Sequence, residues 1–178
     1  MKRNYLLEIQ KQEFVTCLTM ALFPHYTNTG HLQCTVIGAF GENIVEKSPL
    51  TVLNESCEYY GSSFEGRLKS AQQILKRQKN LPIMVSITLE YCMIPLGSPL
   101  KKDTAWVSFR YIKQIDPKGA NSIITFHNGV QLEVNISKDV LETRLNKAAR
   151  LISTYQLRQK MNKDKTMINM IAEDPEEY

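Results

Sequence analysis

The segment Ile123–Ile136 constrains the fold more than any other part of the chain. Its second half, Leu132–Ile136, strictly alternates apolar and polar residues, which is the period of a half-buried β-strand. Between the two apolar halves stands the pair Asn128-Gly129, which supplies the positive backbone angles of a tight hairpin turn. The sequence therefore predicts an antiparallel hairpin with one buried face.

A short helix is predicted in the middle of the chain, where apolar residues recur at the helical period of 3.6. It begins at Phe64, after a cap supplied by Ser62 or Ser63. We expect it to end near Asn80, because the residue before Pro82 is biased away from helical backbone angles.

A second, long helix is predicted after Ser137, which would cap it, with Asp139 in the first turn where the helix dipole favours an anion. Its apolar stripe consists of Leu141, Leu145, Ala148, Ile152 and Tyr155, and off that stripe lie Arg144, Lys147, Arg150 and Arg158. The period is lost past Asn162. Residues 163–178 are therefore predicted to be a loose acidic C-terminal tail.

The rest of the chain is rich in strand signals. Strand-like runs are found at Val15–Phe23, Gln33–Phe40, Ile83–Ile94 and Trp106–Ile115, with a further apolar run at Tyr5–Ile9. The first strand is expected to stop at Pro24, before a turn at Thr27–Gly30. Because no regular β–α–β alternation is present, we predict an α+β fold with a largely antiparallel β-sheet core, one short mid-chain helix and one long C-terminal helix. We expect a single α+β domain over residues 1–162.

The net charge of +4 is unevenly distributed along the chain. Residues 1–66 hold four Lys and Arg against seven Asp and Glu, residues 67–165 hold eighteen against seven, and residues 166–178 hold four acids and no base. The basic middle favours a polyanionic partner. The alternative is a well-solvated surface without a partner.

Basic residues of the middle fall into three groups. They are, in chain order, Arg67, Lys69, Lys76, Arg77 and Lys79; then Lys101, Lys102, Arg110 and Lys113; then Arg144, Lys147, Arg150, Arg158, Lys160, Lys163 and Lys165. The candidate DNA-binding residues are Arg67, Lys69, Lys76, Arg77, Lys101, Lys102, Arg110 and Lys113. Arg67 and Lys69 follow a helix start whose free N–H groups suit a DNA phosphate, and Arg110 and Lys113 are expected on one strand behind the Lys101-Lys102 loop. Each group alone is also compatible with an ordinary solvated face.

Catalytic and metal-binding patterns are not found in the sequence. The three histidines, among them His127 in the hairpin turn, and the four scattered cysteines lack metal-ligand spacing, and the acids are spread singly. The segment Gly61–Gly66 matches neither a nucleophile elbow nor a phosphate-binding loop. We therefore predict a protein that is not an enzyme and uses no metal or cofactor, with reduced and mostly buried cysteines.

Neither a secretory signal nor a membrane-spanning run is predicted. Lys2 and Arg3 are followed by charged residues where an apolar region would be needed, and Pro24 and Gly30 interrupt the longest uncharged stretch. We expect a cytoplasmic location, in association with the nucleoid.

The segment Ser56–Arg67, which reads S-C-E-Y-Y-G-S-S-F-E-G-R, resembles the block S-C-x-[FY]-[FY]-G-S-S-x-x-G-R of the ComK family of competence transcription factors. The resemblance continues in the same order at Pro82–Val85, Ile94-Pro95, Trp106–Ser108 and Thr125–Gly129. From the residues themselves we interpret Ser56–Arg67 as a strand end, a turn at Gly61 and a helix cap.

The resemblance implies a transcriptional activator of DNA-uptake genes. Such a protein binds paired A·T-rich boxes in double-stranded DNA, mainly through the minor groove and the phosphate backbone, as a homo-oligomer (dimer or tetramer). RNA polymerase is a candidate further partner. Met161–Tyr178 does not match the family stretch that the MecA adaptor and Clp protease recognise, which leaves adaptor and protease control open.

Two other classes compete with this interpretation. One is a protein-interaction or regulatory scaffold domain without DNA binding, in which the charge serves solubility. The other is a nucleic-acid hydrolase, which lacks the expected metal or acid–base residues.

Overall fold

The computed structural model describes residues 13–76 and 78–172, with the backbone alone for residues 167–172. The first sheet has the strand order β3-β2-β1-β6-β5-β4 and the second the order β7-β8-β9. The strands of the first sheet are β1 Thr19–Tyr26, β2 Leu32–Gly38, β3 Gly41–Val45, β4 Ile83–Ser86, β5 Tyr91–Pro95 and β6 Trp106–Ser108. The second sheet contains β7 Ile112–Lys118, β8 Asn121–Phe126 and β9 Gln131–Val134. The helices are α2 Pro49–Tyr59, α3 Phe64–Ile74 and α4 Lys138–Ala172, with the 3₁₀ turn η1 at Phe109–Tyr111.

All strand pairs in both sheets are antiparallel, which confirms the predicted α+β class. The predicted hairpin is β8–β9, with Ile124 opposite Leu132. Its turn is wider than expected, because Gly129 alone takes a positive φ, of 86°, and Asn128 does not. The Asn128 Oδ1 instead accepts a hydrogen bond from the Val130 N–H at 3.1 Å.

Pro24 does not end the first strand, contrary to the sequence prediction. β1 runs on to Tyr26, and Pro24 lies opposite Cys34 of β2. β6 pairs with β1 only at Ala21 and Leu22, so the side of β1 that faces away from β2 is free at Pro24. A residue without an N–H is tolerated there because no ladder bond is lost. The predicted turn at Thr27–Gly30 is confirmed, with Gly30 at φ 81°.

The prediction of one mid-chain helix was incomplete, since α2 precedes α3. Ser48 caps α2 by accepting from the Thr51 N–H at 3.1 Å, and Pro49 occupies its first turn. Ser before Pro at a helix start is a recognised signal that could have revealed this helix. The interpretation of Ser56 onward as a strand end is therefore wrong, because these residues form the last turn of α2. The buried Ser56 Oγ accepts from the Val15 N–H at 2.8 Å and fixes the entry to β1.

α3 begins as predicted and ends earlier. Ser63 caps it by accepting from the Gly66 N–H at 3.0 Å. The helix ends at Ile74, and Lys76 then takes a left-handed φ of 53°, which breaks the helical path before Asn80.

Two predicted long strands are divided in the structure. Ile83–Ile94 is the hairpin β4–β5, whose turn includes Glu90 at φ 57°. Trp106–Ile115 is split by η1, which carries the chain from β6 in the first sheet to β7 in the second. Uniform β-propensity gave no indication of either break, because turns made by ordinary residues leave little compositional signal.

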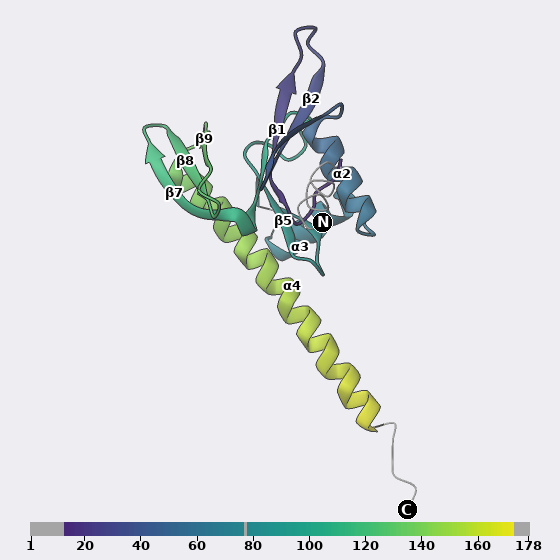
Figure 1. The fold of residues 1–178 in the computed structure, drawn as a ribbon. Helices are drawn as coiled ribbons and strands as arrows, with labels where there is room; N and C mark the ends of the chain where they lie inside the picture. The colour runs from purple at the N-terminus through teal and green to yellow at the C-terminus, as the bar shows by residue number, and fades with distance from the viewer. Residues whose placement is uncertain (1–12, 77, 173–178) are drawn as a thin grey trace, which may run out of the picture.

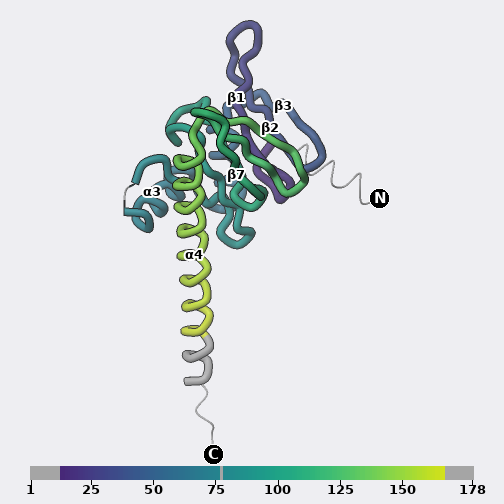
Figure 2. The backbone as a smooth tube through the Cα atoms, turned by 90° about the vertical axis from the view of Figure 1, so that its left-hand side faces the viewer, coloured from purple at the N-terminus to yellow at the C-terminus, as the bar shows by residue number. Residues whose placement is uncertain are grey.

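The first sheet is buried on both faces at β4, β5, β6 and the first half of β1. One core, which includes Val52 and Leu53 of α2, packs against Leu22 and Trp106. A second core lies on the opposite face, where Met20, Ile94 and Val107 pack against the second sheet, α3 and α4. The β1–β2 hairpin and the far end of α4 extend from this body in opposite directions (Figures 1 and 2).

α4 confirms the predicted stripe in part and extends beyond it. Leu141, Ala148 and Tyr155 are buried, and the Tyr155 hydroxyl shares a 2.6 Å hydrogen bond with Ser70 of α3. Arg144, predicted off the stripe, is only 7% exposed, and its Nη1 donates to the Pro95 carbonyl at 2.7 Å. The helix continues past Asn162 to Ala172, so the first part of the predicted loose tail is helical. The acidic segment 173–178 and the run Tyr5–Ile9 lie outside the described residues.

Candidate nucleic-acid interface

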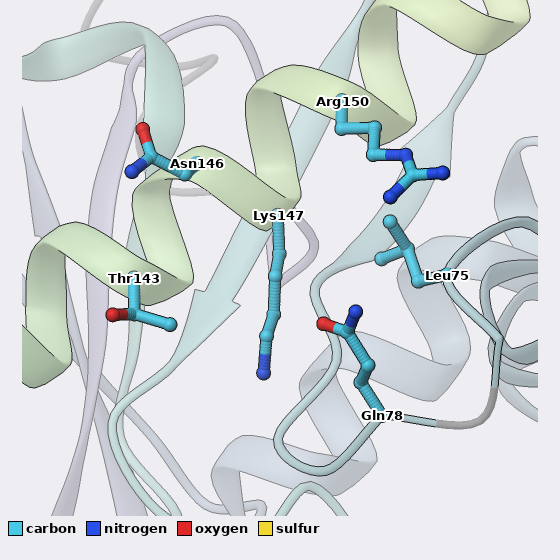
Figure 3. Close-up of a pocket in the computed structure, with 6 residues that line it drawn as sticks. All are labelled: Leu75, Gln78, Thr143, Asn146, Lys147 and Arg150. Atoms are coloured by element: carbon cyan, nitrogen blue, oxygen red, sulfur yellow. The ribbon is translucent and has the colours of Figure 1, made fainter.

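A groove of about 250 Å³ lies between the C-terminal end of α3 and the first half of α4 (Figure 3). Its lining residues are Leu75, Gln78, Thr143, Asn146, Lys147 and Arg150. The side chains of Lys147 and Arg150 extend from α4 toward Leu75 and Gln78 on the opposite side. Two cations, two amides and a hydroxyl thus line a groove to which no carboxylate contributes.

Within residues 13–76 and 78–166, no carboxylate forms an ion pair with the cations of this groove. The ion pairs found within the described part of the chain join Lys47 with Glu13 and Glu55, Lys118 with Glu133, and Lys138 with Glu142. None of them includes a cation of the groove. The Lys147 Nζ instead donates to the Lys79 carbonyl at 2.8 Å, which brings the first and third basic groups of the sequence together.

Burial and the neighbouring Arg144 guanidinium both lower the pKa of Lys147 below its ordinary value. Burial likewise lowers the pKa of Arg144. An opposite charge close to a cation has the reverse effect, since it favours the charged form. A bound phosphate would therefore relieve an electrostatic cost that the free protein carries, and this makes the groove suitable for an anion.

The structure distributes the predicted DNA-binding residues over several surfaces. Lys69 is exposed on α3, and Lys76 is exposed where α3 ends, beside the groove residues Leu75 and Gln78. Arg77 lies outside the described residues. Arg67 is only partly exposed, and its Nε is buried without a partner among the described atoms. Burial raises the pKa of the Cys57 thiol to about 12, and the positive charge of Arg67 acts in the opposite direction on that pKa. Arg67 is therefore packed against α2 rather than extended into solvent.

The second predicted group is not continuous. Lys101 and Lys102 are exposed in the loop between β5 and β6, where the Lys102 carbonyl accepts from the Leu50 N–H of α2 at 3.4 Å. Arg110 lies in η1, with its guanidinium carbon 5.3 Å from the centre of the Tyr91 ring. Lys113 is exposed on β7, in the other sheet. The expectation that Arg110 and Lys113 share a strand is wrong, because η1 separates β6 from β7.

Sequence reasoning missed the residues that the structure brings together. Lys147 and Arg150 were assigned to a separate group and left out of the candidate contacts. Their spacing of three places them on one face of a helix, which was a usable signal. The contact of Lys147 with the Lys79 carbonyl depends on how α4 packs against α3, and no local pattern encodes that packing.

Other kinds of site are not found in the part of the chain that the structure describes. No group of His, Cys, Asp and Glu there could hold a metal ion. All four cysteines are free, and Cys34, Cys57 and Cys92 are buried as expected, whereas Cys17 is exposed. No helix among the described residues combines the length and the apolar character needed to cross a membrane.

The fold and the groove together define a small α+β protein with a cationic surface site that has no carboxylate partner in the part of the chain that the structure describes. The chain belongs to the ComK family, because the family model described as "ComK protein" matches residues 10–162. It is also similar to the competence transcription factor of Bacillus subtilis (strain 168), with 28% identity over 113 residues. That match covers 63% of this chain and 59% of the relative's length. No solved structure matches the chain.

Proposed function

We propose that this protein is a DNA-binding transcriptional activator of competence genes. In this proposal it binds A·T-rich boxes mainly through the minor groove and the phosphate backbone, as a dimer or tetramer. Membership of the ComK family and the name of the relative support the regulatory role. They give no support to an enzymatic activity.

One observation carries the DNA-binding part of the proposal. Lys147 and Arg150 of α4 lie together in the groove between α3 and α4, without a carboxylate partner among the described residues. Cations left without counter-ions attract a polyanion and release its condensed counter-ions on binding. The groove supplies donors that can hold a backbone phosphate, and such contacts position a protein on DNA without reading sequence.

The candidate contact residues outside the groove are expected to contribute unequally to DNA binding. Lys69, Lys76, Lys101, Lys102 and Lys113 are exposed and available to a phosphate. Arg67 and Arg110 are engaged with Cys57 and Tyr91, so we assign them a smaller contribution.

The test is a quantitative binding titration of the full chain with three duplexes that differ only in the boxes: A·T, G·C and inosine·cytosine. Inosine·cytosine lacks the guanine amino group, so its minor groove resembles that of A·T while its major groove resembles that of G·C. We expect similar affinity for the A·T and inosine·cytosine duplexes and weaker binding to G·C. Equal loss with inosine·cytosine and G·C would contradict minor-groove recognition. No binding to any duplex at low salt would exclude DNA as the partner and favour the scaffold alternative.

A further inference from the structure

The β1–β2 hairpin forms a two-stranded ribbon that stands clear of the body (Figures 1 and 2). β6 last pairs with β1 at Leu22, and β3 last pairs with β2 at Cys34. Beyond these points the two strands pair only with each other, up to Tyr26 and Leu32. At about 3.4 Å per residue, β1 extends about 14 Å past its last pair with β6, and β2 extends about 7 Å past its last pair with β3.

The tip of the ribbon is an ordered turn. The Thr27 N–H donates to the His31 carbonyl at 3.0 Å, and the Gly30 N–H donates to the Thr27 carbonyl at 2.9 Å. The Thr27 Oγ1 also accepts from the His31 N–H at 3.0 Å. An isolated ribbon of polar residues needs such bonds to hold one shape, so the tip is preorganised for contact.

The chemistry of the ribbon limits the kind of partner that it can meet. No Asp, Glu, Lys or Arg occurs from Phe14 to Phe40. Asn28, Thr29 and His31 are exposed at the tip, and the Asn28 side chain makes no hydrogen bond to the described residues. All three side chains can donate hydrogen bonds. The floor of an A·T minor groove presents only acceptors, adenine N3 and thymine O2.

Positive charge is found at the root of the ribbon. Lys101 shares the lining of a cavity with Phe23 and Pro24, and the exposed Lys102 follows it. The Tyr26 hydroxyl holds Asp103 of the same loop by a 3.0 Å hydrogen bond. A neutral tip with two lysines behind it suits a DNA groove between two phosphate rows. The opposing charges are Glu46, which lines a depression with His31, and Asp103 and Glu133, which line the same cavity as Lys101.

We propose that the tip Thr27–His31 enters the minor groove of A·T-rich DNA, while Lys101 and Lys102 contact the flanking phosphates. This inference rests on the proposed function and names the segment that reads the groove. The ribbon lies outside the predicted contact residues, which were chosen for their charge.

The test compares Asn28→Ala, Asn28→Asp and Ala120→Asp for binding to A·T duplex across salt concentrations. Ala120 is exposed in the turn between β7 and β8 of the second sheet. Ala120→Asp is therefore the control, because it adds the same negative charge at an exposed turn away from the ribbon. We expect Asn28→Ala to bind about fivefold more weakly, which corresponds to one lost neutral hydrogen bond, with the salt dependence unchanged. Asn28→Asp should lose at least about tenfold, because it places a carboxylate between phosphates, and Ala120→Asp should lose much less.

Two further results complete the test. Glu46→Gln should bind more tightly than the wild type, since it removes a charge that repels the phosphates. Unfolding midpoints of the Asn28 variants should match that of the wild type, because the side chain has no internal partner among the described residues. If Asn28→Asp and Ala120→Asp weaken binding equally, or if Asn28→Ala binds as the wild type does, the tip is not in the groove. If the wild type itself does not bind, the proposed function fails and not this assignment alone.

Discussion

Replacing Arg144 by alanine tests whether α4 is anchored to the first sheet as the structure describes. The guanidinium is 7% exposed, and its Nη1 donates to the Pro95 carbonyl at 2.7 Å. Loss of a hydrogen bond from a charged donor costs about 1.5–3 kcal/mol. Loss of the buried methylene stem adds about 2 kcal/mol. Burial of the charged guanidinium is itself unfavourable, as the lowered pKa of Arg144 shows. Because Arg144→Ala removes this desolvation cost, the net loss of stability is smaller than the sum of the two losses. We therefore expect Arg144→Ala to lower the free energy of unfolding by about 2–3 kcal/mol.

Urea unfolding supplies the measurement, as a lower midpoint with an unchanged slope. Arg144→Met keeps most of the stem and removes the buried charge, so its loss should be smaller, about 1 kcal/mol. Arg150→Ala, on the exposed face of the same helix, is the matched control and should change stability by less than about 0.5 kcal/mol. The sequence alone placed both arginines off the apolar stripe and predicts similar small effects. An Arg144→Ala loss as small as that of the control would refute the anchoring role.

Further predictions follow from the thiols, the lysine in the groove and the second sheet. Cys17 is exposed and should react with a thiol reagent at pH 8 in the native protein. Cys34 and Cys57 should react only after unfolding, because burial raises the pKa of each thiol to about 12. Equal reaction of all thiols in the native protein would contradict their burial. Arg144→Met should raise the pKa of Lys147 toward its ordinary value, as followed by NMR of the side-chain nitrogen, because Arg144 contributes to lowering it; no change would mean that burial acts alone. Phe126→Ala should cost about 3–5 kcal/mol in urea unfolding, because Phe126 is fully buried where the second sheet meets the core, and a loss below about 1 kcal/mol would place it outside the core.

Local signals in the sequence predicted those parts of the fold that depend on neighbouring residues. The β8–β9 hairpin, the Ser63 cap and most of the stripe on α4 follow from spacing and turn chemistry. α2 was missed because the residues from Ser56 onward were interpreted as a strand end, although Ser48-Pro49 marked the start of the helix. The breaks at Glu90 and η1 could not be predicted, since ordinary residues there adopt turns that only tertiary packing enforces.

The sequence predicted the positive charge of the candidate site but not its location in the fold. Counting charges identified the basic middle of the chain, yet a count cannot separate Arg67, which packs beside Cys57, from Arg150, which lines the groove. Arg144 shows the same limit, because its burial depends on the position of the Pro95 carbonyl on another element. Which cations are free is decided by the three-dimensional arrangement of acids and carbonyls around them.

The salt dependence of DNA affinity most directly tests the central claim that the α3–α4 groove holds backbone phosphate. The variant Lys147→Met/Arg150→Met removes both cations of the groove and keeps their stems, and the control Lys118→Met removes a cation that is already paired with Glu133. Each lost phosphate contact lowers the slope of log affinity against log salt by about 0.9. We predict a slope reduced by about 2 for the double variant and nearly unchanged for the control. An unchanged slope for the double variant, or an equal change for the control, would contradict the claim.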